Sequence, residues 1–346
     1  MYKRMAQALD RWTYAAVQAG RVAFFTGQYI VARRRALDAL DEQDDYVPKG
    51  GFPGRQGMLE ALREVFQRDW ANVQAGVYPM PLPLAGPGRA LRTTRSYLGD
   101  IEAITERRRR RGMFDVRREA EVGEGDYPGY YLQNFHYQTG GWLSEDSAAV
   151  YDHQVEVLFT GSADAMRRMA LPPLKARLAE TPARPRVLDV AAGTGRFLYW
   201  LKRALPRARV TALDLSAAYL ARVPEHVPSA RTVQAPAEAM PFAEGVFDAV
   251  TCVYLFHELP PKVRPQVAQE IARVLRPGGR AVIVDALQTG DRPDFDGLLE
   301  MFPRRFHEPY FTSYLDTDLP ALFQPLTLVS AQPAFLSKVF VFDKPA

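Results

Sequence analysis

The amino-acid sequence predicts an α/β fold, with a mostly parallel sheet in the second half of the chain and a mainly helical first half. After Pro185, apolar runs of strand length alternate with segments of helical periodicity, which is typical of βαβ units with helices on both faces of a sheet. Before residue 145, apolar residues recur mostly at helical spacing. We therefore expect two regions, residues 1–145 and residues 146–346.

The composition is that of an ordinary globular protein, with 47% hydrophobic and 24% charged residues among 346. The net charge of +4 is small, which disfavours a nucleic-acid partner. The only cysteine, Cys252, excludes an internal disulfide and fits a reducing compartment, so we expect a cytoplasmic location.

Residues 2–40 are expected to form one long helix or two stacked helices, followed by helices over 58–75 and 93–110. The longest apolar run of the first segment, residues 22–32, would extend about 16 Å as a helix, which is too short to cross a bilayer. The sequence leaves open a peripheral membrane contact through residues 1–40, and also a homodimer.

An irregular stretch over 123–142 and helices over 145–159 and 163–179 lead into the alternating region. Helices near 196–205, 216–223 and 262–276 separate its strands. The expected strands are Arg186–Val190, Val210–Asp214, Thr232–Gln234, Phe247–Tyr254 and Arg280–Asp285, followed by a hairpin of Leu326–Ser330 and Ser337–Phe342 that turns around Gln332-Pro333.

The most informative motif is the stretch VLDVAAGTG at 187–195, a strand that ends in a glycine-rich turn before a helix. Gly193 and Gly195 would let the backbone approach a ligand, which the N–H groups at the start of the helix would face. Asp214 ends the next strand, 19 residues after Gly195, where a carboxylate can accept both hydroxyls of a ribose. The pattern predicts a nucleoside site.

The glycine-rich motif has two other interpretations, a plain turn without a ligand and a dinucleotide-binding turn. A single G-x-G also occurs in plain strand-to-helix turns. A dinucleotide-binding dehydrogenase would need a third glycine at position 198, where Leu198 stands.

Four stretches, in this order, resemble the class I S-adenosylmethionine (AdoMet) dependent methyltransferases, and most of all their small-molecule group with the ubiquinone/menaquinone-type C-methyltransferases. The likeness covers residues 150–346. It implies a Rossmann-like, seven-stranded sheet with a C-terminal antiparallel hairpin, and AdoMet as the cofactor. The stretches are VLDVAAGTG (187–195), ALDLS (212–216), AEAMPFAEGVFDAV (237–250) and IARVLRPGGRAVIVD (271–285).

The same resemblance assigns parts of the cofactor to residues. The methionine part would lie against Asp189 and the 193–195 turn, the ribose against Asp214, and the sulfonium beside Tyr254. The residues implied in cofactor binding are Asp189, Ala191, Gly193, Thr194, Gly195, Asp214, Leu215, Ala237, Glu238 and Tyr254.

This sequence departs from the family pattern twice. Ala191 replaces the first glycine, a mild change if its φ is negative. Pro236 replaces an acid that contacts the adenine in many members, so adenine recognition would depend on backbone groups.

Methyl transfer from a sulfonium depends mainly on holding the reactants close together in a dry pocket. A base is needed only if the acceptor carries a proton at the reacting pH. His257 and Glu258 follow the fourth strand and are expected to open onto the sulfonium, so His257 is the candidate base. The alternative is that His257 caps a helix or packs structurally.

The segment 127–138 combines five aromatic residues, one histidine and three amides. It suits a pocket for a planar or prenylated acceptor, or else an aromatic packing cluster. The pre-core helix and the insertion after the fifth strand would also face the acceptor. The candidates are His257, Glu258 and His136 for catalysis, and Tyr131, Tyr151, His153 and His307 for substrate binding.

The run Arg107–Arg111 indicates either a solvated helix end or a surface for RNA or anionic lipid, and we favour the former. Histidines at metal-binding spacing are absent from the sequence, so we expect no metal. The leading hypothesis is methylation of a small aromatic, quinone-like or lipid-like acceptor at carbon or oxygen. The alternatives are methylation of RNA or protein, and a catalytically silent binding protein.

Overall fold

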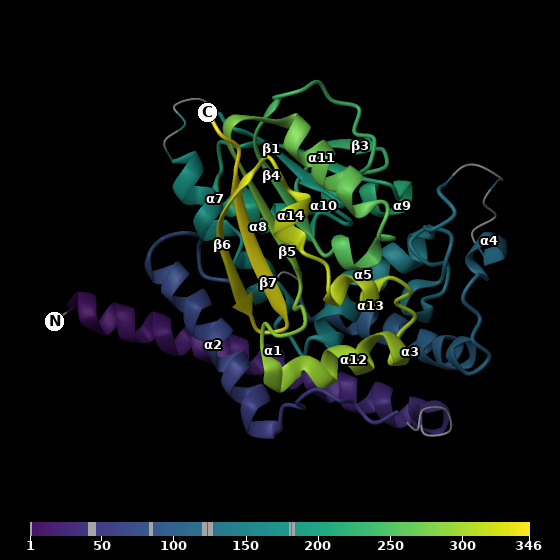
Figure 1. Cartoon of the computed structure of the whole chain (residues 1–346). Coiled ribbons are helices and arrows are strands. Elements are labelled where there is room, and N and C mark those ends of the chain that lie inside the picture. Colours follow the sequence, from purple (N-terminus) through teal and green to yellow (C-terminus); the bar gives the residue numbers. More distant parts are fainter. Residues whose placement is uncertain are drawn as a thin grey trace.

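The fold is built on one seven-stranded sheet with the strand order β3-β2-β1-β4-β5-β7-β6. The computed structural model (Figure 1) describes residues 2–40, 46–82, 86–119, 123, 127–179, 181 and 184–346. Strands β1 to β5 pair in parallel, and β7 is antiparallel to β5 and to β6. The expected α/β class and C-terminal hairpin are confirmed. The strands are β1 (Arg186–Val190), β2 (Arg209–Asp214), β3 (Arg231–Gln234), β4 (Phe247–Val253), β5 (Leu275–Ala286), β6 (Thr327–Ala334) and β7 (Ser337–Asp343).

Both faces of the sheet are covered, which explains why its central strands are continuous apolar runs. In β1, Val187 belongs to the core on one face, while Leu188 and Val190 belong to the core on the other. Cys252 of β4 lies fully buried in the second core. The helices and turns of this half are α8 (Arg196–Ala204), α9 (Ala217–Leu220), α10 (Val223–His226), η2 (Phe256–Glu258), α11 (Arg264–Val274), η3 (Pro293–Phe295), α12 (Asp296–Arg305), α13 (Phe311–Leu315) and α14 (Leu319–Leu322).

The turn of the C-terminal hairpin differs from the expectation. It lies at Phe335-Leu336, and Pro333 is part of β6 instead of the turn. β6 is the edge strand of the sheet. An edge strand tolerates a proline because the missing N–H can face away from the neighbouring strand.

The first half of the chain is mainly helical, and α1 is a single 39-residue helix. In Figure 1, α1 and α2 run below the sheet, at the end opposite the C-terminus. α1 and α3 pack against α5, so contacts cross the boundary that we expected near residue 145, and the division into two domains stays a prediction. The elements are α1 (Tyr2–Leu40), α2 (Arg55–Gln74), α3 (Pro87–Arg109), α4 (Val116–Glu119), η1 (Phe135–Tyr137), α5 (Glu145–Leu158), α6 (Ala163–Arg168) and α7 (Leu171–Leu178).

Two segments expected as single helices are each divided in two. The segment 163–179 separates into α6 and α7, and the segment 216–223 separates into α9 and α10. The second helix of each pair has a proline in its first turn. A proline lacks the N–H that would continue the preceding helix but fits the first turn of a new one.

A buried charge cluster fastens the first two helices to α6. Asp69 on α2 is fully buried and accepts two hydrogen bonds from the Arg168 guanidinium, at 2.8 and 2.7 Å. The hydroxyls of Tyr14 and Tyr78 each donate to the same carboxylate at 2.7 Å. Every charge in the cluster therefore has a partner, as a buried ion pair requires.

The α1 helix also carries large apolar side chains that face solvent. Leu9 is 68% exposed and Trp12 is 74% exposed. None of the described helices is both long and apolar enough to cross a bilayer. Membrane contact through residues 1–40 and a homodimer both stay predictions.

Substituting Asp69→Ala should lower the free energy of unfolding by about 3–5 kcal/mol, because it leaves the Arg168 guanidinium buried without a counter-charge. Urea unfolding followed by circular dichroism measures the change. The matched control is Glu64→Ala, which removes an exposed partner of Arg292 and should cost less than about 1 kcal/mol. Equal losses in the two variants would contradict a dominant role for the buried cluster.

Candidate active site

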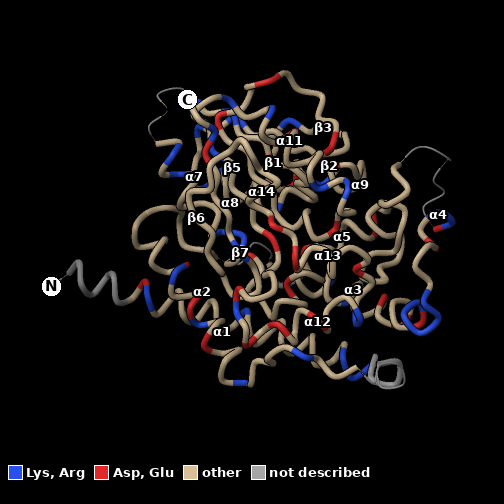
Figure 2. The backbone as a smooth tube through the Cα atoms, in the orientation of Figure 1, with Lys and Arg blue, Asp and Glu red and all other residues tan. Residues whose placement is uncertain are grey.

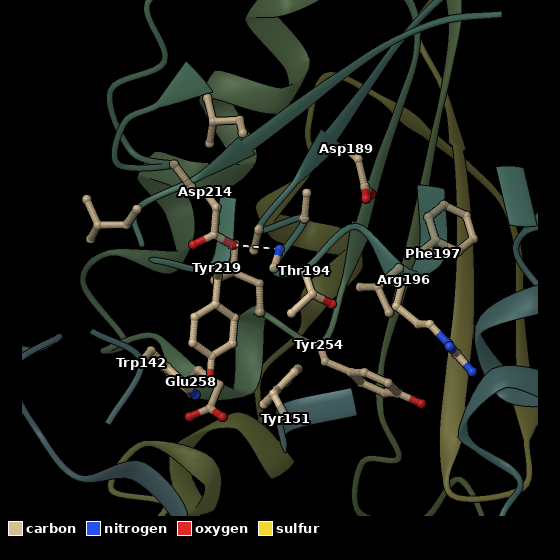
Figure 3. Close-up of a pocket in the computed structure, with 18 of the residues that line it drawn as sticks. Trp142, Tyr151, Asp189, Thr194, Arg196, Phe197, Asp214, Tyr219, Tyr254 and Glu258 are labelled. Atoms are coloured by element: carbon tan, nitrogen blue, oxygen red, sulfur yellow. Dashed lines mark hydrogen bonds between the residues drawn. The ribbon is translucent and has the colours of Figure 1, made fainter. Parts of the chain in front are cut away.

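A cavity opens at the carboxyl ends of β1, β2 and β4, where ligands of parallel α/β sheets bind. Together with its opening it holds about 1020 Å³ of space free of atoms. Figure 3 shows Asp189, Thr194 and Asp214 along the strand ends, with Trp142, Tyr151 and Glu258 beyond them. The cavity thus lies between the sheet and the segment before it in the chain.

The glycine-rich turn and the second strand are joined by a carboxylate. Asp214 accepts a hydrogen bond from the Gly193 amide at 2.8 Å through one oxygen (Figure 3). Its other oxygen accepts a hydrogen bond from the Ser216 amide at 2.8 Å. Burial raises the pKa of Asp214 above its usual value, and these amide donors oppose the shift. The carboxylate borders the cavity, as expected for a group that binds a ribose.

Ala191 differs from the sequence-based expectation. Its φ is +55°, in the left-handed region, whereas the replacement of glycine is mild only for a negative φ. A side chain in that region costs about 1–2 kcal/mol. The turn holds the residue there because Asp214 fixes the Gly193 amide two residues later.

Asp189 lies at the deep end of the cavity and is 1% exposed. Burial, with a smaller contribution from Asp214, raises its pKa to about 7, although the Thr251 hydroxyl donates to it at 2.7 Å. Nearby, Thr194 donates to Asp152 of α5 at 2.9 Å, which links the glycine-rich turn to the pre-core helix.

Nine of the ten expected cofactor-binding residues line the cavity. Gly195 is not among the lining residues. Its φ of +81° and the 3.2 Å between a Cβ added there and Val223 show that it serves the packing of α8 on α10. The nine lining residues are Asp189, Ala191, Gly193, Thr194, Asp214, Leu215, Ala237, Glu238 and Tyr254.

The opposite wall is aromatic. Tyr131 lies between Tyr127 and Trp142, with ring centroids 5.7 and 5.6 Å away. Tyr130 donates to Glu238 at 2.6 Å, so this segment touches the part of the cavity that follows β3. The aromatic rings of the segment 127–138 therefore pack against neighbouring rings and also line the cavity.

Sequence reasoning missed several residues that line the cavity. Trp142 follows the aromatic segment directly and could have been found from that position. Arg196 and Phe197 directly follow the glycine-rich turn, so their position in the first turn of the next helix was also a usable signal. Nothing in their sequence context marked Arg167 and Tyr219, because an isolated arginine or tyrosine on a helix is common. The missed residues include Trp142, Arg167, Arg196, Phe197 and Tyr219.

His257 is paired with Asp285 and does not line the cavity. Its Nδ1 is 2.5 Å from an Asp285 oxygen, and Asp285 is fully buried. Burial alone would lower the pKa of His257, but the Asp285 carboxylate outweighs it and raises the pKa to about 9. With its Nδ1 atom held by Asp285 and its ring outside the cavity lining, His257 is not placed to contact an acceptor directly, and its role as a base stays a prediction.

The other two catalytic candidates meet at the cavity. Glu258 lines it, whereas His136 lies behind Glu258 and is not among the lining residues; the His136 Nε2 atom is 3.5 Å from Glu258 and 3.0 Å from Glu308. Burial and the neighbouring Glu308 raise the pKa of Glu258 to about 7. Burial lowers the pKa of His136, but the two carboxylates dominate and raise it to about 10. Sequence reasoning did not select Glu308.

The candidate substrate-binding residues fall into two groups. Tyr131 and Tyr151 line the cavity, whereas His153 and His307 do not. His153 faces α1, with its Nε2 atom 2.6 Å from Gln28, and burial lowers its pKa to about 4. His307 lies 2.9 Å from Gln133, behind the aromatic wall.

The arginine run at the end of α3 is the dense blue segment beside α4 in Figure 2. It is not simply a solvated helix end. Arg107 is 4% exposed, donates to the Tyr137 carbonyl at 2.7 Å and pairs with Glu119 at 2.5 Å. Arg108 lies over the rings of Tyr137 and Phe306. These contacts hold the segment that carries His136.

Substituting Ala191→Gly should leave the free energy of unfolding equal or raise it by up to about 1 kcal/mol, because relief of the left-handed strain exceeds or balances the entropy cost of glycine. Thermal and urea unfolding measure this. The control is Ala192→Gly, one residue later and without a positive φ, which should destabilise by about 0.5–1 kcal/mol. If Ala191→Gly destabilises the protein as Ala192→Gly does, the backbone at Ala191 is not strained.

Comparison with known proteins agrees with this geometry. A family model described as a methyltransferase domain matches residues 187–279. An uncharacterized methyltransferase of Synechocystis is 38% identical over 140 residues, which is 40% of this chain and 63% of that protein. A demethylmenaquinone methyltransferase of Beutenbergia cavernae is 34% identical, over 48% of this chain and 65% of its own length.

A 2-phytyl-1,4-naphtoquinone methyltransferase of Thermosynechococcus vestitus is 35% identical, over 41% of this chain and 62% of its own length. The matches thus span just under two thirds of these relatives. The strand order, the cavity at the strand ends and the family match confirm the resemblance stated from the sequence. Residues 187–279 match a methyltransferase domain, and the strand order and the cavity of this half fit that match.

Proposed function

We propose that this protein transfers a methyl group from AdoMet to a small aromatic, quinone-like acceptor. The observation that carries the proposal is one cavity with two unlike ends. One end has the glycine-rich turn and buried carboxylates, and the other has an aromatic wall. A charged nucleoside and a planar acceptor need these two environments side by side.

The residues present fit AdoMet. Asp214 can accept the ribose hydroxyls, and Leu215 offers an apolar surface for the adenine. Asp189 would hold the cationic methionine end, because a buried carboxylate is stabilised by a positive charge. When bound, AdoMet supplies a methyl group on a sulfonium that leaves as a neutral thioether.

The aromatic wall and the relatives together favour a quinone-like acceptor. Tyr131 and Trp142 offer flat apolar surfaces, and the named relatives include methyltransferases for demethylmenaquinone and 2-phytyl-1,4-naphtoquinone. We propose that Glu258 and His136 meet the polar atoms of the acceptor. His257, held by Asp285, is then a positioning residue for the loop that carries Glu258.

We further propose that residues 1–145 cap the acceptor end. The Tyr130–Glu238 hydrogen bond and the arginine contacts to the Tyr137 region support this role. The same contacts make methylation of RNA through the arginine run the weaker alternative, because Arg107 and Arg108 are used internally. The other alternative, a catalytically silent protein with a decayed cofactor site, would show no binding in a titration with AdoMet.

Isothermal titration should show that the protein binds AdoMet and that Asp214→Ala weakens binding about 10- to 100-fold, the loss of about 1.5–3 kcal/mol from hydrogen bonds to a charged group. The control is Asp248→Ala, which removes a β4 carboxylate that instead accepts hydrogen bonds from the Arg186 backbone amide and the Arg276 guanidinium. The AdoMet affinity of the Asp248→Ala variant should equal that of the wild type. A wild-type protein that does not bind AdoMet would refute the proposed activity.

With AdoMet and a prenylated naphthoquinol as the acceptor, mass spectrometry should detect a methylated product. Tyr131→Leu should raise the acceptor KM at least about 5-fold, corresponding to about 1 kcal/mol of lost aromatic contact, and leave the AdoMet Kd nearly unchanged. Tyr199→Leu, on α8 and outside the cavity lining, is the control. Equal changes in KM and Kd for Tyr131→Leu would favour a packing role.

A further inference from the structure

Three potential metal ligands from distant parts of the chain meet beside the cavity, which one of them, Glu258, lines. The Nε2 atom of His136 and carboxylate oxygens of Glu258 and Glu308 all lie within 4.8 Å of one another. His136 comes from η1, Glu258 follows β4, and Glu308 lies between α12 and α13. Their sequence separation explains why spacing rules did not find this group.

The two carboxylates lack the hydrogen bonds that buried oxygens normally have. Glu308 is 3% exposed, and its Oε1 atom forms an ion pair with the His136 Nε2 atom at 3.0 Å, but neither of its oxygens accepts a hydrogen bond of good geometry from the described residues. Glu258 is 6% exposed, and its Oε2 atom likewise accepts no hydrogen bond from the residues described. Buried polar atoms without a partner are costly and mark a strained site or a missing ion.

The separations suit a metal ion. The His136 Nε2 atom lies 3.0 Å from Glu308 and 3.5 Å from Glu258. Ligand atoms at about 2.1 Å from an ion lie about 3 Å apart when they are adjacent in its coordination shell. His136 also has a φ of +56°, a strained backbone of the kind that gathers at functional sites.

We propose that His136, Glu258 and Glu308 bind one divalent metal ion at the acceptor end of the cavity. Binding of the ion would displace the proton of His136 to solvent. Two carboxylates and the resulting neutral imidazole balance the charge of a dication, and this mixed oxygen and nitrogen set suits Mn²⁺, Fe²⁺ or Zn²⁺. Because Glu258 lines the cavity, an ion bound to it would lie next to the space that an acceptor would occupy.

The purpose of the ion rests on the proposed function. An ion there would bind an oxygen atom of the acceptor and orient its ring against the aromatic wall. It would also make a bound hydroxyl more acidic, with the released proton passing to solvent. Binding of the ion itself requires neither AdoMet nor an acceptor, so the two proposals can fail separately.

The test is titration of the full-length protein, first freed of metal by a chelator, with Mn²⁺ alone. Electron paramagnetic resonance and calorimetry should show one equivalent bound. Glu308→Gln and His136→Gln should each weaken binding at least 10-fold. The control is Glu238→Gln, which removes a carboxylate from the same cavity outside the cluster and should leave the Mn²⁺ affinity unchanged.

Other results would overturn the proposal. If the wild-type protein binds no Mn²⁺ or Zn²⁺, or if Glu238→Gln weakens binding as much as Glu308→Gln, the cluster is a structural ion pair of His136 with its carboxylates. A lower unfolding temperature of Glu308→Gln, with no metal bound by the wild type, would identify that structural role. Should Glu308→Gln fail to fold, Glu258→Gln gives the same comparison.

Discussion

The hydrogen bond from the Gly193 amide to the Asp214 carboxylate is the constraint on which the cofactor end of the site depends. It ties the turn after β1 to the end of β2, two neighbouring parallel strands. With the turn fixed in this way, Ala191 is kept in a left-handed conformation and the floor of the cavity is set. Asp214 therefore has a structural role even before a ribose is bound, as a preorganised site requires.

The acceptor end depends on buried charge instead of backbone geometry. Asp285 and His257 fix the loop after β4, and Arg107 and Arg108 fix the segment that carries His136. These contacts bring Glu258, His136 and Glu308 into one cluster between the sheet and the helical half. The helical half thus contributes more than a cover, because it supplies one member of the cluster and the aromatic wall.

The fold and the cofactor end were predictable because their signals are local. β1, the glycine-rich turn and Asp214 lie within about 30 residues, and a parallel sheet brings strand ends to one edge regardless of the rest of the chain. The boundaries of the elements were predicted less accurately near prolines. Pro333 lies in an edge strand instead of a turn, and prolines divide two expected helices. Whether Pro333 would lie in a turn or in an edge strand depends on its neighbours.

The sequence by itself determined the α/β sheet, the glycine-rich turn and the family resemblance, because periodicity and short motifs are properties of neighbouring residues. Only the tertiary structure decided that Ala191 is strained, that His257 faces Asp285, and that His153 faces α1. It also decided the meeting of His136 with Glu258 and Glu308, which are more than a hundred residues away from it along the chain. Burial and charge pairing between distant segments set these outcomes, and no local pattern encodes them.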